Sequence, residues 1–248
     1  MNPLSFLGDD RLRTATVTGA HWLDHVALWR PLDPDLLVTG EHETAVLLLG
    51  GTFDLVGGGT AWPARGARKD VFGGRPMAVY LPKHTEFRTS KGLGEILLLA
   101  ARQPLAREAT GRELLAKKPL LPLAGSGKSF DPNSGEWMPA ETFPSAPESL
   151  PPRRFERITV GACTLERVFA PGYKAATLSV DEVAVPAGAS LALRDVPGRP
   201  ASDEVLVFVR GSGADQAFVA AGNGDDVRIE SPANQPTYAV FAYAGKAR

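Results

Sequence analysis

The sequence contains very little cysteine and lacks histidine in its last two-thirds. Cys163 is the only cysteine, which excludes an intrachain disulfide and a zinc site built from several thiolates. All four histidines, His21, His25, His42 and His84, lie before residue 85. A metal site in the later part of the chain would therefore have no imidazole ligand.

An excess of charge and long apolar runs are also missing. The chain has 27 basic and 28 acidic residues and a formal net charge of -1, so neither nucleic acid nor an anionic membrane is an expected partner. No apolar run approaches the roughly 20 residues that span a bilayer. The first ten residues lack the basic region of a signal peptide. We therefore expect a cytoplasmic protein.

Helix signals are sparse, and the best candidate is residues 107–118, which Pro119 would end. In their place, short apolar runs alternate with abundant glycine and proline. The runs are residues 46–49, 53–56, 77–81, 96–100, 176–180, 182–185, 205–209 and 238–243. Each has the length of a strand and is bounded by turn formers such as Gly50-Gly51. This rhythm predicts an all-β protein of the sandwich or barrel class.

A proline-rich stretch separates the two groups of runs. Residues 119–152 hold eight prolines and few apolar pairs, which is typical of a surface connector. We predict an N-terminal barrel over residues 1–118, this connector, and a C-terminal barrel over residues 153–248.

The C-terminal part contains a spacing of glycines and a glutamate that resembles the first motif of the cupin superfamily. Gly188, Glu204 and Gly211 occupy the motif's glycine and glutamate positions, but Arg194 and Val196 stand where the motif has histidines. The resemblance implies a divalent metal in this barrel. Arginine carries a fixed positive charge and no acceptor, so this sequence predicts a barrel without that metal.

Charged side chains near this motif are candidates for a binding site. Glu204 is the one cupin-position ligand that remains, and we take it as the catalytic candidate. Arg194, Asp195, Arg199 and Tyr238 are the candidate ligand-binding residues, since a guanidinium can pair bidentately with a carboxylate or phosphate. The alternative is a solvated loop whose charges face water.

The N-terminal part carries a more specific resemblance. Residues 39–51 hold Glu-Thr before an apolar run and a Gly-Gly pair, and residues 71–82 follow the pattern Val-Phe…Pro…Val-Tyr-Leu-Pro. These motifs resemble the family of 5-deoxyglucuronate isomerase and 5-keto-4-deoxyuronate isomerase over about residues 36–100.

This resemblance implies a fold and an activity. It implies a bicupin, that is, two double-stranded β-helix (jelly-roll) barrels, and an aldose–ketose isomerisation of a sugar acid, as in inositol catabolism. The family uses a divalent metal such as zinc, held by a histidine-rich segment of the C-terminal barrel. That segment has no counterpart here, so no cofactor is expected and the metal site is degenerate.

The N-terminal histidines are the only fallback for a metal. His21 and His25 are four residues apart and share one face of a helix or a strand, and His84 would complete a set with a carboxylate. His42 and Glu43 are successive and point to opposite faces of a strand. Scattered surface histidines are the alternative.

Two hypotheses for the function remain open. The first is a divergent sugar-acid isomerase without the usual metal, and the second is a non-catalytic bicupin that binds a small ligand or has a structural role. A small sugar acid is the expected partner, and paired edge strands would suit a homodimer.

Overall fold

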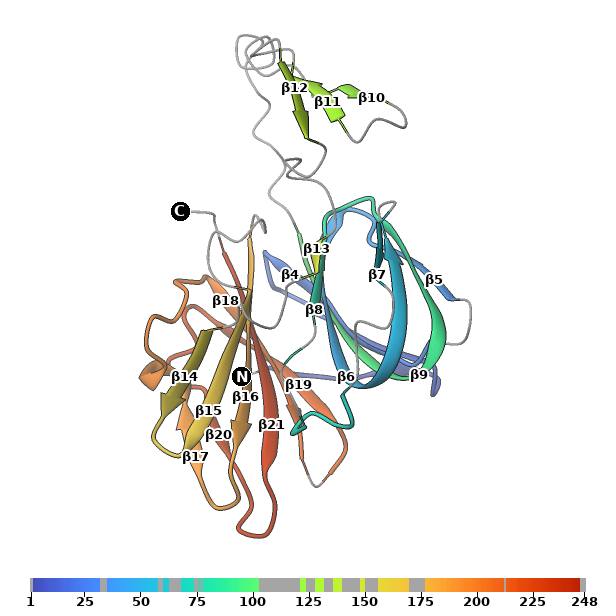
Figure 1. Cartoon of the computed structure of the whole chain (residues 1–248). Helices are drawn as coiled ribbons and strands as arrows, with labels where there is room; N and C mark the ends of the chain where they lie inside the picture. Colours follow the sequence, from blue (N-terminus) through green and yellow to red (C-terminus); the bar gives the residue numbers. More distant parts are fainter. Residues whose placement is uncertain are drawn as a thin grey trace. The chain divides into compact units, whose positions relative to one another are not determined.

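The apolar runs form β-strands in the computed structural model. The structure describes residues 2–31, 35–57, 60–62, 68–73, 76, 78–102, 121–123, 128–131, 136–139, 148–149, 156–169, 177–211 and 213–245. Within this part of the chain the only helical element is a 3-10 turn, Leu193–Asp195. The predicted all-β class and two-barrel architecture are confirmed, while the predicted helix at 107–118 lies outside the described residues (Figure 1).

The N-terminal barrel is built on a nine-stranded antiparallel sheet in the order β13-β8-β6-β9-β4-β3-β2, with β5 paired to β9 and β7 to β6. Its strands are β2 (Leu7–Gly8), β3 (Leu12–Thr16), β4 (Leu23–Trp29), β5 (Asp35–Val38), β6 (His42–Gly57), β7 (Thr60–Trp62), β8 (Ala78–Leu81), β9 (Glu86–Arg102) and β13 (Glu148–Ser149). The long strands β6 and β9 run beside each other through most of the barrel.

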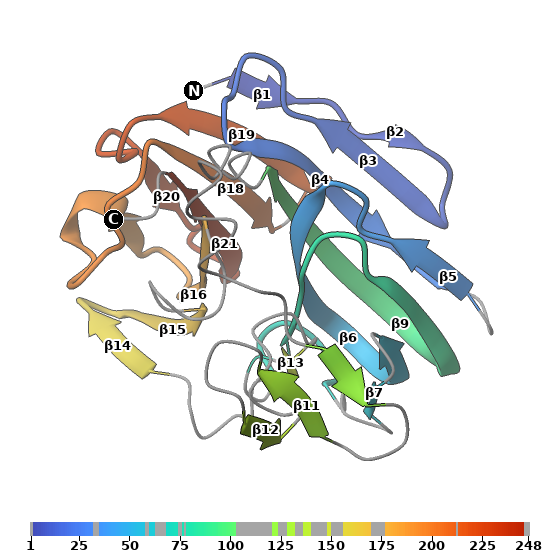
Figure 2. The same cartoon turned by 90° about the horizontal axis from the view of Figure 1, so that it is seen from above.

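The C-terminal barrel is built on a seven-stranded sheet in the order β1-β19-β18-β21-β16-β15-β14, with a separate pair of β17 and β20. Its strands are β1 (Asn2–Leu4), β14 (Glu156–Val160), β15 (Cys163–Phe169), β16 (Leu178–Val185), β17 (Ser190–Ala192), β18 (Glu204–Arg210), β19 (Gln216–Ala221), β20 (Arg228–Glu230) and β21 (Thr237–Ala244). The N-terminal strand β1 thus lies in the sheet of the second barrel (Figure 2).

The glycines expected to end the run at 46–49 behave differently from the prediction. Gly50 and Gly51 lie inside β6, where the register with β9 shifts between Leu48 and Gly50. The extra residue of such a bulge bends the strand without ending it. The prediction of a turn at this point was wrong, because a glycine pair serves a bulge as well as a hairpin.

Both barrels belong to one compact unit, which comprises Met1–Gln103 and Pro147–Arg248, and Pro104–Ala146 forms a second unit. The second unit contains a three-stranded antiparallel sheet of β10 (Leu121–Leu123), β11 (Lys128–Asp131) and β12 (Glu136–Pro139). The predicted boundaries at 118/119 and 152/153 stay a prediction. Strand β1, however, joins the sheet of the C-terminal barrel, and β13, which lies in the predicted connector, joins the sheet of the N-terminal barrel.

Strand alternation divides the C-terminal barrel's apolar residues between two environments. On β18, Val205 and Val207 face the packed interior of the barrel, whereas Leu206 and Phe208 belong to a core shared by both barrels. Successive side chains of a strand point to opposite faces, so one strand serves both cores. We call the shared core the barrel interface.

The barrel interface also contains a buried ion pair. The Arg68 guanidinium lies 3.0 Å from a Glu182 carboxylate oxygen, and it donates a further hydrogen bond of 3.2 Å to the carbonyl of Leu48. Burial alone would lower the pKa of Arg68, but the Glu182 carboxylate offsets this and raises it, so the guanidinium stays charged. Burial raises the pKa of Glu182, against the opposing effect of Arg68. The guanidinium also stands 5.8 Å from the centre of the Tyr238 ring.

A second carboxylate crosses the barrel interface in the other direction. Glu43 on β6 is completely buried and accepts a 2.9 Å hydrogen bond from the Tyr80 hydroxyl. Its other oxygen accepts a 2.8 Å hydrogen bond from the backbone N–H of Thr177, just before β16. The two barrels are therefore joined by polar contacts as well as by apolar area.

Inside the C-terminal barrel, Asp181 is the polar exception. Its side chain is buried, and the Arg167 Nε donates to it at 3.2 Å. Burial raises the pKa of Asp181 to about 6, against the opposing effects of Arg167 and Tyr243. One Asp181 oxygen and the Tyr243 hydroxyl have no hydrogen-bond partner that satisfies normal geometry.

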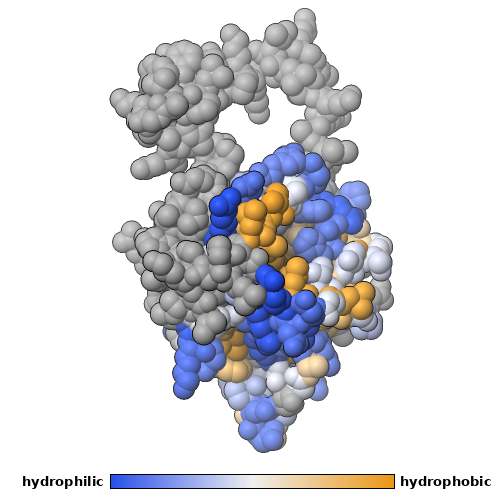
Figure 3. Space-filling model, turned by 90° about the vertical axis from the view of Figure 1, so that its right-hand side faces the viewer, coloured by the Kyte–Doolittle hydropathy of each residue, from blue (hydrophilic) through white to orange (hydrophobic). Residues whose placement is uncertain are grey.

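Exposed apolar side chains are few on the described surface. Leu7, Leu36, Val38 and Phe72 are the large ones, and Figure 3 shows hydrophobic residues in separate patches among hydrophilic ones. No helix in the described part of the chain is long and apolar enough to cross a membrane. A homodimer stays a prediction.

The Arg68–Glu182 pair gives a test of how the barrels are joined. We expect Arg68→Met to lower the free energy of unfolding by about 3–5 kcal/mol, because it leaves the Glu182 charge buried without a partner. The double variant Arg68→Met/Glu182→Leu should recover much of this loss, and urea unfolding of the four proteins measures it. Additive losses in the double variant would contradict a coupled pair.

Asp181 gives a pH test. Its folded pKa lies above the ordinary value of 3.8, so the folded state holds this proton more tightly than the unfolded state. The resulting stability is complete below pH 3.8 and is lost as the pH rises through about 6. The full effect is roughly 3 kcal/mol.

We therefore expect the free energy of unfolding to increase as the pH falls from 7 to 4.5, and Asp181→Asn to flatten that increase. The matched control is Glu230→Gln, which changes an exposed carboxylate. Identical pH profiles for wild type and Asp181→Asn would rule out Asp181 as the source.

Candidate functional site

The residues at the cupin histidine positions do not fit a divalent metal. Val196 is buried in the apolar core of the C-terminal barrel and offers no donor. Arg194 lies in the 3-10 turn with 67% of its side chain exposed, and its nearest charged contact is Asp195 at 4.0 Å. The chemistry of these side chains therefore gives no ligand set at this position.

Glu204, the catalytic candidate from the sequence, serves a different purpose in the structure. It shares a face of β18 with Leu206 and Phe208, so it points to the barrel interface and not into the C-terminal barrel. Its carboxylate accepts hydrogen bonds from the backbone N–H groups of His21, Trp22 and Leu23, the last two at 3.0 and 2.9 Å. Both oxygens are thus engaged, which argues for a structural role.

The predicted ligand-binding residues do not meet at one site. Arg194 and Asp195 are exposed to solvent. Arg199 pairs with Asp225 at 2.5 Å, and Tyr238 is buried in the barrel interface beside Arg68. The solvated-loop alternative describes Arg194 and Asp195 well.

The fallback set of histidines is not brought together either. His21 is exposed and packs edge-on against Trp22, with ring centres 4.7 Å apart. His84 is exposed and lies 3.4 Å from Glu41. In the described part of the chain, no group of three or more histidine, cysteine, aspartate or glutamate side chains is placed to hold a metal.

Two histidines do meet, at one end of the N-terminal barrel. The Nδ1 atom of His25 lies 2.9 Å from an oxygen of Asp24, and the Nε2 atom of His42 lies 3.3 Å from the same oxygen. The two imidazole rings are 5.7 Å apart in an edge-to-face arrangement. We call Asp24, His25 and His42 the imidazole cluster.

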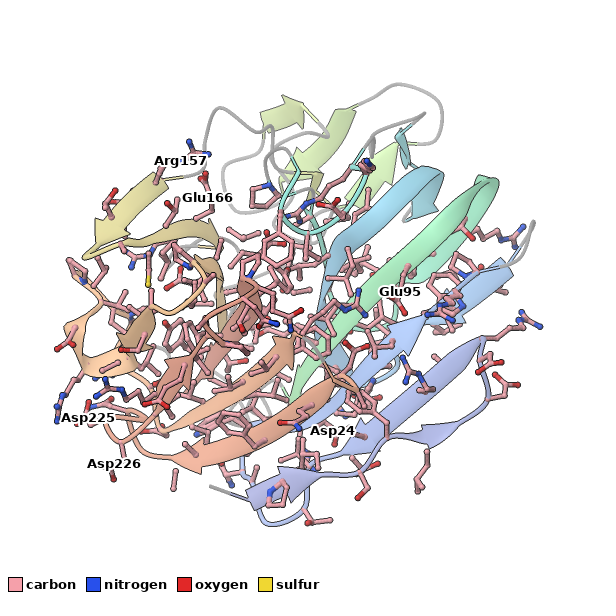
Figure 4. All side chains as sticks on the ribbon, turned by 90° about the horizontal axis from the view of Figure 1, so that it is seen from below. Asp24, Glu95, Arg157, Glu166, Asp225 and Asp226 are labelled. Atoms are coloured by element: carbon pink, nitrogen blue, oxygen red, sulfur yellow. The ribbon has the colours of Figure 1, made fainter. Side chains whose placement is uncertain are left out.

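Arg102 completes the surroundings of the imidazole cluster. Its Nε and one terminal nitrogen donate to the other Asp24 oxygen at 3.0 and 2.8 Å. Burial works to raise the pKa of Asp24, but the hydrogen bonds from His25 and Arg102 prevail and lower it. Asp24, which Figure 4 labels beside β4, is therefore ionised at neutral pH.

The ionised carboxylate fixes the tautomer of His25. A carboxylate only accepts hydrogen bonds, so the Nδ1 atom of His25 carries the proton in their contact. The neutral ring then has a lone pair on Nε2. An imidazole oriented by a carboxylate in this way is a general base.

His25 also lines a cavity of about 110 Å³ at this end of the barrel. The cavity is mostly apolar, with Leu12, Leu37, Leu81, Phe87 and Leu98 among its lining residues. Thr14, Thr39 and Thr44 also line it. The arrangement offers one base and several threonine side chains in a small, mostly apolar space.

The sequence pointed to His25 but paired it with the wrong partners. The predicted metal set leaves out His42 because the next residue, Glu43, points to the opposite face of the strand. The structure confirms these opposite directions, since Glu43 lies in the barrel interface. The signal that would have found the imidazole cluster is the strand order, because β9 pairs with both β4 and β6. Asp24 was not singled out from the sequence, although it directly precedes His25 on β4.

Comparisons with known proteins agree with the fold. Residues 33–119 match the model of the KduI/IolB family. An IolB-like protein from Salmonella typhimurium LT2 has a TM-score of 0.60 at 16% identity, over 99% of this chain and 93% of that one. No curated protein matches the chain.

Two further solved structures have a similar fold. Quercetin 2,3-dioxygenase from Acinetobacter baumannii has a TM-score of 0.54 at 8% identity, over 98% of this chain and 78% of that one. Streptomyces albus HEPD, with 2-hydroxyethylphosphonate and Fe(II) bound, has a TM-score of 0.52 at 12% identity, over 98% and 74%. These likenesses concern the fold alone.

The resemblance found in the sequence is thereby confirmed for residues 33–119, which match the model of the KduI/IolB family, and the two-barrel fold of the chain is similar to that of the IolB-like protein.

Proposed function

We propose that the chain is a divergent sugar-acid isomerase that moves a proton with His25 and does not use the usual cupin metal. The observation that carries this proposal is the position of His25, held by Asp24 and lining the cavity of the N-terminal barrel. The matched family segment includes His42 and Arg102, which complete the surroundings of Asp24.

The chemistry requires a base near a carbonyl compound. In an aldose–ketose isomerisation, a base removes the proton from the hydroxyl-bearing carbon beside the carbonyl, and an acid protonates the carbonyl oxygen. The base then returns its proton to the former carbonyl carbon, and the acid takes back a proton from the hydroxyl that becomes the new carbonyl, so no atom is gained or lost. In this proposal the Nε2 atom of His25 is the base. Protonated His42, whose Nε2–H faces Asp24, supplies a proton to oxygen from Nδ1 and later recovers one from the other hydroxyl.

Charge at the mouth of the cavity supports an acidic substrate. Arg102 balances the Asp24 carboxylate, so protonation of either imidazole gives the cluster a net positive charge. Positive charge attracts the carboxylate of a sugar acid. The 5-deoxyglucuronate of inositol catabolism is the first substrate to test, given the resemblance.

The cavity volume limits how the substrate enters. The volume of about 110 Å³ is well below the roughly 300–1,000 Å³ of typical small-molecule sites. Only the reacting end of an open-chain sugar acid fits beside His25, and the rest extends toward the exposed Arg102. Isomerisation acts on the open-chain form, which is consistent with this limit.

The same small volume favours the second candidate, a non-catalytic bicupin that binds a small ligand. An apolar cavity lined by one histidine binds a short molecule without transforming it. The two candidates differ in whether a carbon-bound proton exchanges with solvent.

We expect the wild-type protein, after treatment with a chelator, to exchange deuterium from the solvent into 5-deoxyglucuronate at the carbon beside the carbonyl. His25→Gln should slow this exchange and the isomerisation by about 10²–10⁴-fold, which is the usual contribution of a general base. Proton NMR of the substrate measures both rates.

His84→Gln is the matched control, because it changes an exposed histidine outside the imidazole cluster. Equal loss in both variants, or full activity in His25→Gln, would overturn the role of His25. Binding of the sugar acid without any exchange would favour the non-catalytic candidate. Loss of the exchange on chelation would contradict the metal-free step.

A further inference from the structure

A second cavity lies where the two barrels meet. Its volume is about 810 Å³, and its lining comes from β6, β9, the segment after Arg68, and Arg210 at the end of β18. Cavities of about 300–1,000 Å³ accommodate small molecules of drug size. It is far larger than the cavity beside His25, and the lining residues of the two do not overlap.

Three arginines and two carboxylates form a network at this cavity. Arg210 binds both oxygens of Asp215 at 2.8 Å and reaches Glu95 at 2.6 Å. Arg30 and Arg13 join the network through Glu95 at 3.1 Å and Asp215 at 3.3 Å. Figure 4 shows Glu95 on β9, away from Arg157 and Asp225 at the outer side of the C-terminal barrel.

The three arginines carry three positive charges and the two carboxylates carry two negative charges, so the network has a net charge of +1. Burial works against the charge of Arg210, yet Asp215 and Glu95 raise its pKa, so this guanidinium stays charged. Arg30 uses only its Nε atom in the network, and 54% of its side chain is exposed. Its terminal N–H groups suit a carboxylate or a phosphate, which a guanidinium binds bidentately.

The remaining lining suits the body of a sugar. Gly50, Gly51 and Gly94 leave backbone exposed to the cavity, and a methyl group on Gly50 would come within 3.3 Å of the Lys69 carbonyl. Phe72 is 47% exposed, and its ring is supported edge-on by Tyr238 at 6.5 Å. An exposed, supported aromatic ring offers a flat apolar surface to sugar C–H groups.

We propose that this cavity is a binding site for an anionic carbohydrate, with Arg30 and Arg210 holding its carboxylate or phosphate and Phe72 contacting its ring. The proposal is independent of the acid–base site, because none of these residues belongs to the imidazole cluster. A chain without isomerase activity would still have this site.

The test is isothermal titration of the full-length protein with D-glucuronate, glucose 6-phosphate, D-glucose and inorganic phosphate. We expect at least one of the two anionic sugars to bind about tenfold or more tightly than glucose and inorganic phosphate. Tighter binding of glucuronate identifies a carboxylate ligand, and tighter binding of glucose 6-phosphate identifies a phosphate ligand.

Variants then locate the binding. Arg30→Gln should weaken the anionic sugar about tenfold, and Phe72→Ala should weaken it without changing the binding of inorganic phosphate. Arg157→Gln is the control, because Arg157 is an exposed arginine paired with Glu166 in the C-terminal barrel. Both test positions are well exposed, so the variants should fold, which circular dichroism checks.

Three results would overturn the proposal. The first is that neither anionic sugar binds. The second is that glucose binds as tightly as the anionic sugar, which would show that the site does not recognise the anionic group, or that inorganic phosphate does, which would show that it does not recognise the sugar. The third is that Arg30→Gln binds like wild type or that Arg157→Gln loses as much.

Discussion

Buried carboxylates that reach across the barrel interface in both directions hold this structure together. Glu43 extends from the N-terminal barrel to Thr177, while Glu182 and Glu204 extend from the C-terminal barrel to Arg68 and to the backbone of residues 21–23. A buried charge without partners is costly. The barrels therefore cannot slide or separate without exposing or orphaning several charges at once, and one relative placement is strongly preferred.

This placement decides where chemistry can occur. Apolar side chains fill most of both barrel interiors. The exceptions are the Arg167–Asp181 pair in the C-terminal barrel and the small cavity beside His25 in the N-terminal barrel. What remains are the end of the N-terminal barrel, where His25 meets Asp24, and the junction where Arg210 approaches Glu95. In the described part of the chain, the packing of the barrel interiors and of the barrel interface thus leaves these two places as the candidate sites.

The sequence predicted the fold better than the site, for a physical reason. Strand-length apolar runs identify strands directly, since burial of apolar side chains drives their formation. The glycines at 50 and 51 were misread because a bulge and a turn need the same residue type. The spacing around Glu204 resembles the cupin motif, but the direction of its side chain depends on which of two cores each face of β18 contacts, which one sequence does not reveal. The meeting of His25 and His42 depends on a third strand, β9, placed between β4 and β6.

The pairing of β1 with β19 has a consequence for how the chain folds. Pro3 lies opposite Phe218, so β1 finds its partner strand β19 only after the long stretch of chain between them has been made. Until then its backbone donors and acceptors remain exposed, as on any unpaired strand edge. Closing so long a loop is slow, because the entropy of closure must be overcome before the contact forms. Completion of the second barrel's sheet is therefore a late event of folding, and it brings the two ends of the sequence together in one sheet.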